Sequence, residues 1–147
     1  MTVRIAAAVL VLMVAACGGG GAEDQVVASP SAQPPAESGA ASASFASPKA
    51  DAKVDSPVAL TMKAKNIAIE DSGVVRKGAG HFHVMIDTKC VAKGKVIPED
   101  AKHVHYGDAS TKAKLKLDPG KHKLCLQLGN GGHKALGKTD TVTITVK

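Results

Sequence analysis

STKAKLKLDPGKHKLCLQL, residues 110–128, decides the fold class of this chain. Apolar and polar residues alternate on both sides of a central Asp-Pro-Gly, which is the pattern of two half-buried β-strands. Pro119 and Gly120 suit the middle of a turn, and pairing Leu117 with His122 brings the leucines of both segments to one face. The stretch therefore predicts an antiparallel hairpin with an apolar inner face.

Similar alternation continues on either side of this stretch. SPVALTMKA (56–64), HFHVMID (81–87) and TDTVTITVK (139–147) each have the pattern of one strand, and no segment shows a convincing helical period. Polar breaks recur at short intervals. The sequence therefore predicts an all-β domain over residues 55–147, a small antiparallel β-sandwich of immunoglobulin-like architecture.

The first residues of the chain predict export. Arg4 precedes twelve apolar residues, 5–16, a run too short for a permanent membrane span and typical of a secretory leader. Val14-Ala15-Ala16-Cys17 then resembles a bacterial lipobox, so we expect residues 1–16 to be a lipoprotein signal peptide and Cys17 to be lipidated. A leader without lipidation is the weaker alternative.

Residues 17–54 are rich in Ala, Ser, Pro and Gly and contain scarcely any large apolar side chain. Such a segment cannot bury enough surface to offset its ordering entropy, so we expect a disordered tether. The domain would then be held at the extracytoplasmic face of a bacterial membrane by its lipid anchor.

Two cysteines, Cys90 and Cys125, remain after the lipidation site. Cysteines outside the cytoplasm normally oxidise, and only one pairing is open to these two, so we expect a Cys90–Cys125 disulfide. A metal-ligand role is the alternative, and it is disfavoured because neither cysteine belongs to a CxxC pair.

Histidines supply the main functional signal, because all six lie between residues 81 and 133. Alternation on the strand 81–87 directs Phe82 to the core and places His81, His83, Met85 and Asp87 on the opposite face. A second pair one residue apart follows at His103 and His105, and four imidazoles would converge if the two segments were neighbours. Two imidazoles, a thioether and a carboxylate on one face of the strand 81–87 suit a borderline or soft metal, copper before zinc. The candidate ligands are His81, His83, His103, His105 and His133, with Met85 as a further candidate.

Structural roles are the alternative for these histidines, since imidazoles at sheet edges often hydrogen-bond to loop backbone. His133 follows the glycine-rich segment 129–132, and a ligand and an exposed loop residue are equally compatible with that position. His122 shares its face with three leucines beside the turn, which favours a packed and hydrogen-bonded structural role.

The charge of the domain is basic, with sixteen Lys and Arg against nine Asp and Glu in residues 55–147. Lys112, Lys114 and Lys116 lie on the outer face of the predicted hairpin, as do Lys121 and Lys123. They either keep an exposed sheet soluble or contact an anionic partner such as phospholipid headgroups or envelope polymers. Nucleic acid is disfavoured as a partner, because the domain is expected outside the cell and has few aromatic side chains for stacking.

No catalytic motif is present: the chain has no GxSxG nucleophile elbow, no phosphate-binding glycine loop and no dinucleotide fingerprint. Three hypotheses follow from the sequence. The first is a lipid-anchored metal-binding module, and the second is a structural or interaction module with a basic face. The third and least favoured is a redox enzyme similar to copper–zinc superoxide dismutase.

Four stretches carry a family resemblance: GHFHVMID (80–87), IPEDAKHVHYGDAST (97–111), LDPGKHKLCLQLG (117–129) and GGH (131–133). Together they resemble a family of exported bacterial domains of unknown function, DUF4399. The resemblance implies a compact β-sandwich whose histidine-bearing segments gather on one side, and it implies no established reaction. The chain departs from the family's pattern at Phe82, where many members have a third histidine, and at Asn130, where an acidic residue is common.

Overall fold

Alternating apolar side chains produce strands throughout the part of the chain that the computed structural model describes, residues 39–147. The predicted signal peptide, Cys17 and most of the predicted tether lie outside these described residues. The described strands are β1 (Ser42–Ser47), β2 (Lys53–Val54), β3 (Val58–Lys65), β4 (Ala68–Ile69), β5 (Ala79–Ile86), β6 (His103–Tyr106), β7 (Lys112–Leu115), β8 (Gly120–Gly129) and β9 (Ala135–Val146). Within residues 39–147 no helix is long and apolar enough to cross a membrane.

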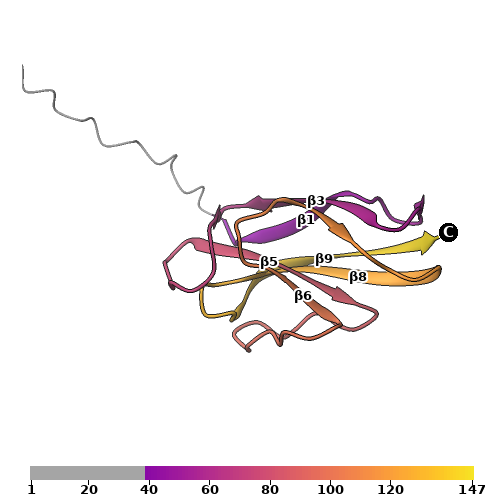
Figure 1. Ribbon diagram of the computed structural model, residues 1–147. Coiled ribbons are helices and arrows are strands. Elements are labelled where there is room, and N and C mark those ends of the chain that lie inside the picture. The colour runs from indigo at the N-terminus through magenta and orange to yellow at the C-terminus, as the bar shows by residue number, and fades with distance from the viewer. Residues whose placement is uncertain (1–38) are drawn as a thin grey trace, which may run out of the picture. The chain divides into compact units, whose positions relative to one another are not determined.

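The strands form one curled sheet in the order β4-β5-β8-β9-β1-β3-β7, with β6 added beside β5 and β2 beside β9. One layer consists of β1, β3 and β7, and a second consists of the remaining strands; a single parallel pair, Ser42 with Lys138, joins β1 to β9. Figure 1 shows β1 and β3 lying over β5, β8 and β9. The all-β prediction is confirmed. The sheet is mixed rather than purely antiparallel, because β1–β9, β2–β9 and β4–β5 are parallel pairs.

The hydrophobic core fills the space between the two layers and follows the predicted alternation. The first layer contributes Phe45, Leu60 and Met62, among others, and the second contributes Phe82, Leu126 and their neighbours. Each buried side chain of this core is at most 8% exposed. The core therefore depends on period-two patterning in strands from both halves of the sequence.

The predicted hairpin of residues 110–128 is wrong, because its two strands do not pair with each other. The prediction of which leucines face the core is confirmed. β7 pairs with β3, and β8 pairs with β5 and β9. The segment around Pro119 carries the chain from one layer to the other instead of reversing it within one layer. Leu115 and Leu124 still face the same core from opposite layers. Alternation shows only which face of a strand is buried. It is the same for a hairpin within one layer and for two strands in opposite layers, so it could not distinguish the two.

The predicted domain start at residue 55 is also wrong. β1 and β2 lie within residues 42–54, which the composition assigned to the tether. Phe45 is 6% exposed in the core, and its N–H donates to the Asp140 carboxylate at 2.8 Å. Burial of such a side chain contributes about 1.5–3 kcal/mol relative to exposure. β1 was missed because only two of its residues, Ala43 and Phe45, are buried, and the surrounding alanines and serines match the composition of a tether.

Candidate metal centre

The long connection between β5 and β6, residues 87–102, folds over the outer face of β5 and β8, and we call it the cover segment. The predicted disulfide between Cys90 and Cys125 ties it to β8, with a Cα–Cα distance of 5.7 Å. The Gln127 side chain accepts from the Val91 N–H at 2.9 Å and donates to the Val91 carbonyl at 2.7 Å. Ile97, a residue of the cover segment that is only 1% exposed, packs with Met85 and Cys125 in a second apolar cluster. Both faces of β5 are therefore buried.

Four imidazole rings pack against one another on this covered face. His81 and His83 come from β5, His105 comes from β6, and His133 comes from the connection between β8 and β9. The centroids of all six ring pairs are separated by 4.5 to 5.5 Å. Four points at nearly equal mutual distances lie at the corners of a tetrahedron. We call these four residues the histidine cluster.

Strand register explains how two of the segments meet. β5 and β6 are antiparallel neighbours, and His83 pairs directly with His105 across them. Side chains of residues that pair directly across two strands lie close together on the same face. His81 occupies the next position on that face of β5, because side chains two residues apart share one side of a strand.

A tight turn brings in the fourth ring. The Asn130 side chain accepts from the N–H groups of Gly132 and Lys134, and the His133 N–H donates to the Asn130 carbonyl at 2.8 Å. His133 itself has a φ of 60°, in the left-handed region. Its carbonyl accepts from the Ile97 N–H at 2.8 Å, which fixes the turn against the cover segment.

Two glycines leave room for the rings. A Cβ atom at Gly129 would lie 2.7 Å from Nε2 of His83, and one at Gly107 would collide with the ring of His105. Any larger residue at either position would have to displace an imidazole. The glycines therefore act as spacers, a role that the sequence pattern did not reveal.

Glu99, in the cover segment, orients two of the rings. Its Oε1 atom lies 2.8 Å from Nδ1 of His133 and 3.2 Å from Nδ1 of His105. A carboxylate at Nδ1 stabilises the tautomer that carries its proton there and leaves the lone pair on Nε2. Nε2 of His105 is buried and has no hydrogen-bond partner among the described residues. Sequence reasoning missed Glu99, whose only signal was its place four residues before the second histidine pair.

The two rings from β5 are fully buried and held neutral. Burial, together with the nearby rings of His105 and His133, lowers the pKa of His81 to about 4. Burial, and then the neighbouring histidines with His81 first, lowers the pKa of His83 to about 3. Both side chains are 0% exposed, and their Nε2 atoms are 2.9 Å apart. Neutral imidazole is the form that binds metals.

Unpaired nitrogen atoms mark the cluster as incomplete on its own. Nδ1 of His81 and Nδ1 of His83 are also buried without a partner in the described part of the chain. Leaving such an atom unsatisfied typically costs about 1–3 kcal/mol. Ligand nitrogens of His81, His105 and His133 all lie within 4.8 Å of one another, so these residues could hold a metal ion.

The structure does not bring His103 into the cluster. His103 pairs with Met85 across β5 and β6, one repeat further along the strands, and its Nδ1 contacts the Asp100 carboxylate at 2.8 Å. Met85, the further candidate ligand, is 0% exposed and packs against Ile97 and Cys125. It is a core side chain, because the cover segment makes this face of β5 an interior.

His122 lies apart from the cluster, at the other end of β8. Its two ring nitrogens contact the Asp87 carboxylate at 2.8 Å and the Asp118 carbonyl at 2.9 Å. The Asp118 carbonyl and then the Asp87 carboxylate raise the pKa of His122. These contacts support the structural role predicted for this residue.

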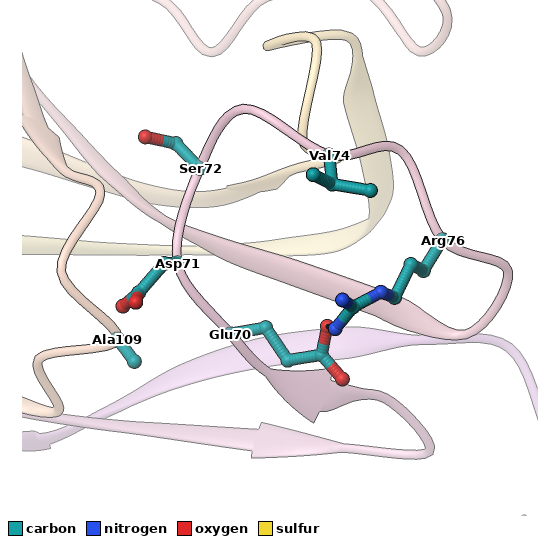
Figure 2. A pocket seen from close by; sticks show the side chains of 6 residues that line it. All are labelled: Glu70, Asp71, Ser72, Val74, Arg76 and Ala109. Atoms are coloured by element: carbon teal, nitrogen blue, oxygen red, sulfur yellow. Dashed lines mark hydrogen bonds and ion pairs between the residues drawn. The ribbon is translucent and has the colours of Figure 1, made fainter.

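A pocket of about 430 Å³ opens beside the cluster but contains none of its rings. Figure 2 shows Glu70 and Arg76 pointing toward each other across it, joined by an ion pair of 2.9 Å. The same loop donates from Ser72 N–H to the Gly107 carbonyl, and from Gly73 N–H to the Gly131 carbonyl. It therefore braces the two segments that carry His105 and His133.

A comparison with known families matches residues 60–147 to the profile of the family described as a domain of unknown function, DUF4399. The chain belongs to this family. No curated protein and no solved structure gives a match. The matched residues of the DUF4399 domain include all four members of the histidine cluster and Glu99. They do not include β1, which contributes Ala43 and Phe45 to the hydrophobic core.

Proposed function

We propose that this DUF4399 protein is a metal-binding module that holds one transition-metal ion in the histidine cluster. The single observation that carries the proposal is the near-tetrahedral packing of four rings, with all six centroid separations between 4.5 and 5.5 Å. The buried Nε2 atom of His105 supports it, because an ion would satisfy a nitrogen that has no partner among the described residues.

The donor set favours zinc before copper. Tetrahedral coordination by imidazole suits Zn²⁺, whereas Cu²⁺ prefers a square-planar arrangement. The predicted preference for copper relied on a thioether at Met85, and that side chain packs in an apolar cluster. Zinc–nitrogen bonds of about 2.0–2.1 Å imply nitrogens roughly 3.3 Å apart. The Nε2 atoms of His81 and His83, now 2.9 Å apart, would separate slightly on binding.

We further propose that the module acts outside the cytoplasm, attached by lipid at Cys17. The leader and lipobox support this placement, and a disulfide is typical of oxidising compartments. A largely buried set of imidazoles suits storage or transfer of an ion, and we propose no reaction at the site.

Metal titration tests the proposal. The purified, disulfide-bonded protein, stripped with a chelator, should bind one equivalent of Zn²⁺ by calorimetry. It should also bind Co²⁺ with the intense visible absorption of tetrahedral coordination. His81→Ala should weaken zinc binding by roughly a hundredfold or more, since it removes a ligand rather than an outer partner.

The matched control is His122→Ala, which removes one imidazole from the same chain outside the cluster. It should leave zinc affinity within about threefold of the unmodified protein. Failure to bind zinc, cobalt or copper, or equal affinity in the His81→Ala variant, would remove the proposed function.

A further inference from the structure

The outer face of the β1–β3–β7 layer carries lysines and small residues. Ser44 pairs with Lys63, Thr61 pairs with Lys112, and Ala59 pairs with Lys114, all on the side away from the core. None of the three strands contains Asp or Glu. We call this surface the basic face; its lysines are Lys63, Lys65, Lys112, Lys114 and Lys116.

Three lysines of this surface carry charge that no acidic side chain of residues 39–147 pairs with. Lys63, Lys112 and Lys114 are exposed and form no ion pair within residues 39–147. Lys112 and Lys114 lie two residues apart on one side of β7, and like charges so close repel each other. An anionic surface laid against the face would relieve this repulsion, and the small side chains between the lysines would not obstruct it.

The opposite side of the sandwich carries acidic residues and lysines together. Glu99 and Asp100 belong to the cover segment, and Asp71 pairs with Asp108 next to the segment that carries His105. The histidine cluster and the basic face are thus on the two outer surfaces of the sandwich, with the core between them. β6 belongs to the second layer, beside β5, and Figure 1 shows it farther from β1 and β3 than β9 and β8 are.

We propose that the basic face docks onto an anionic phospholipid surface. Charge complementarity favours such a partner, because lysines near an anionic membrane are attracted to its negative surface potential. The path of the chain supports it: β1, the first of the described strands, lies in the layer that carries the basic face, and the predicted lipid site at Cys17 precedes it in the sequence. A lipid anchor combined with a polybasic surface gives firmer attachment than either alone.

Docking in this way orients the module. The histidine cluster, on the other outer surface, would face away from the membrane and toward whatever delivers or accepts the ion. This consequence rests on the proposed metal-binding function, whereas the docking itself does not, because no residue of the basic face belongs to the cluster.

Vesicle sedimentation tests the docking without a lipid anchor. Residues 18–147 contain every described strand and both apolar clusters, so this soluble segment can be used. It should sediment with vesicles of phosphatidylcholine and phosphatidylglycerol, and should not sediment with phosphatidylcholine alone. Raising the salt from 0.05 to 0.5 M should reduce binding by roughly tenfold or more, since the attraction is screened.

The variant Lys63→Glu/Lys112→Glu/Lys114→Glu should lose at least tenfold in binding to anionic vesicles. A control with the same change of charge, Lys93→Glu/Lys95→Glu/Lys134→Glu, alters exposed lysines near the cover segment and should lose less than threefold. Circular dichroism establishes that both variants fold.

Three results would overturn the docking proposal: equal losses in the two variants, binding to neutral vesicles, or binding to soluble polyphosphate without binding to anionic vesicles. The last result would assign the face to an envelope polymer. Zinc titration of the same variants is expected to match the unmodified protein, so failure of docking and failure of metal binding are told apart.

Discussion

Two histidine pairs of identical spacing lie side by side on β5 and β6 and end in different environments. The pair on β5 places both rings, His81 and His83, in the histidine cluster. The pair on β6 places only His105 there, while His103 contacts Asp100 in the turn before the strand. Spacing sets the side of the strand on which a ring lies, and register together with nearby carboxylates decides whether it reaches a shared point.

The difference arises from a shift of one repeat. His105 is opposite His83, whereas His103 is opposite Met85, about 7 Å further along the sheet. At that position the covered face is apolar, because Ile97 and Cys125 pack there. An HxH pattern on one strand therefore supplies two ligands only where other segments bring ligands within reach of both of its positions.

The largest expected effect separates the two histidines of β6. His105→Ala should weaken zinc binding by roughly a hundredfold or more, because it removes one of four ligands. His103→Ala should change affinity by less than about threefold. Competition titration against a chromophoric chelator measures both values. Comparable losses in the two variants would mean that the rings rearrange on binding and that the comparison between the pairs does not hold.

An intermediate effect is expected from the carboxylates that contact these rings. Glu99→Gln removes the charge shared by His105 and His133 and should reduce zinc affinity about 10–100-fold, the range for outer partners of ligand histidines. Asp100→Asn is the matched control, since the Asp100 carboxylate contacts His103 and no ring of the histidine cluster. This variant should have little effect on zinc affinity. A Glu99→Gln variant with unchanged affinity would show that the orientation of the rings does not depend on this carboxylate.

A further prediction concerns the stability of the metal-free protein as the pH falls. His81 and His83 have folded-state pKa values of about 4 and about 3. Between pH 6.5 and about 4 the unfolded chain therefore binds more protons than the folded protein, and the free energy of unfolding decreases as the pH is lowered. From pH 7.5 to 5 the loss is up to about 2 kcal/mol per ring. Urea unfolding at the two pH values measures it, and His83→Leu should make the dependence shallower.

His122 provides a control of opposite sign in the same experiment. Its pKa is raised in the folded state, so it contributes stability below pH 6.5 that is lost as the pH rises through the folded value. His122→Gln should therefore steepen the loss of stability on acidification. A pH dependence that neither substitution alters would have to originate in other groups.

The sequence predicted the faces of the strands better than their partners. Alternation correctly placed Leu115, Leu124 and Ile144 in the core, because burial on one face is a local property of each strand. It misplaced the partners of β7 and β8, since two strands that share a core can lie in one layer or in opposite layers. It also missed β1, where a single large residue, Phe45, supplies most of the signal.

The sequence predicted that histidines form the candidate site, and it predicted only in part which histidines belong to it. Neighbouring strands could be suspected from the two histidine pairs, and the glycine-rich turn allowed His133 to join them. The exclusion of His103 could not be foreseen, because it depends on register. Burial of the rings depended on the cover segment, whose attachment through Gln127 and Ile97 has no pattern in the local sequence.

The cluster draws its rings from three stretches that are far apart along the chain, the last of them 52 residues after the first. An unfolded chain cannot present them together, so an ion held there would act as a removable cross-link that exists only in the native state. At a free concentration one hundred times the dissociation constant it would add about 2.7 kcal/mol to the free energy of unfolding. The supply of metal in the compartment where folding finishes would then help to decide how long each molecule survives there.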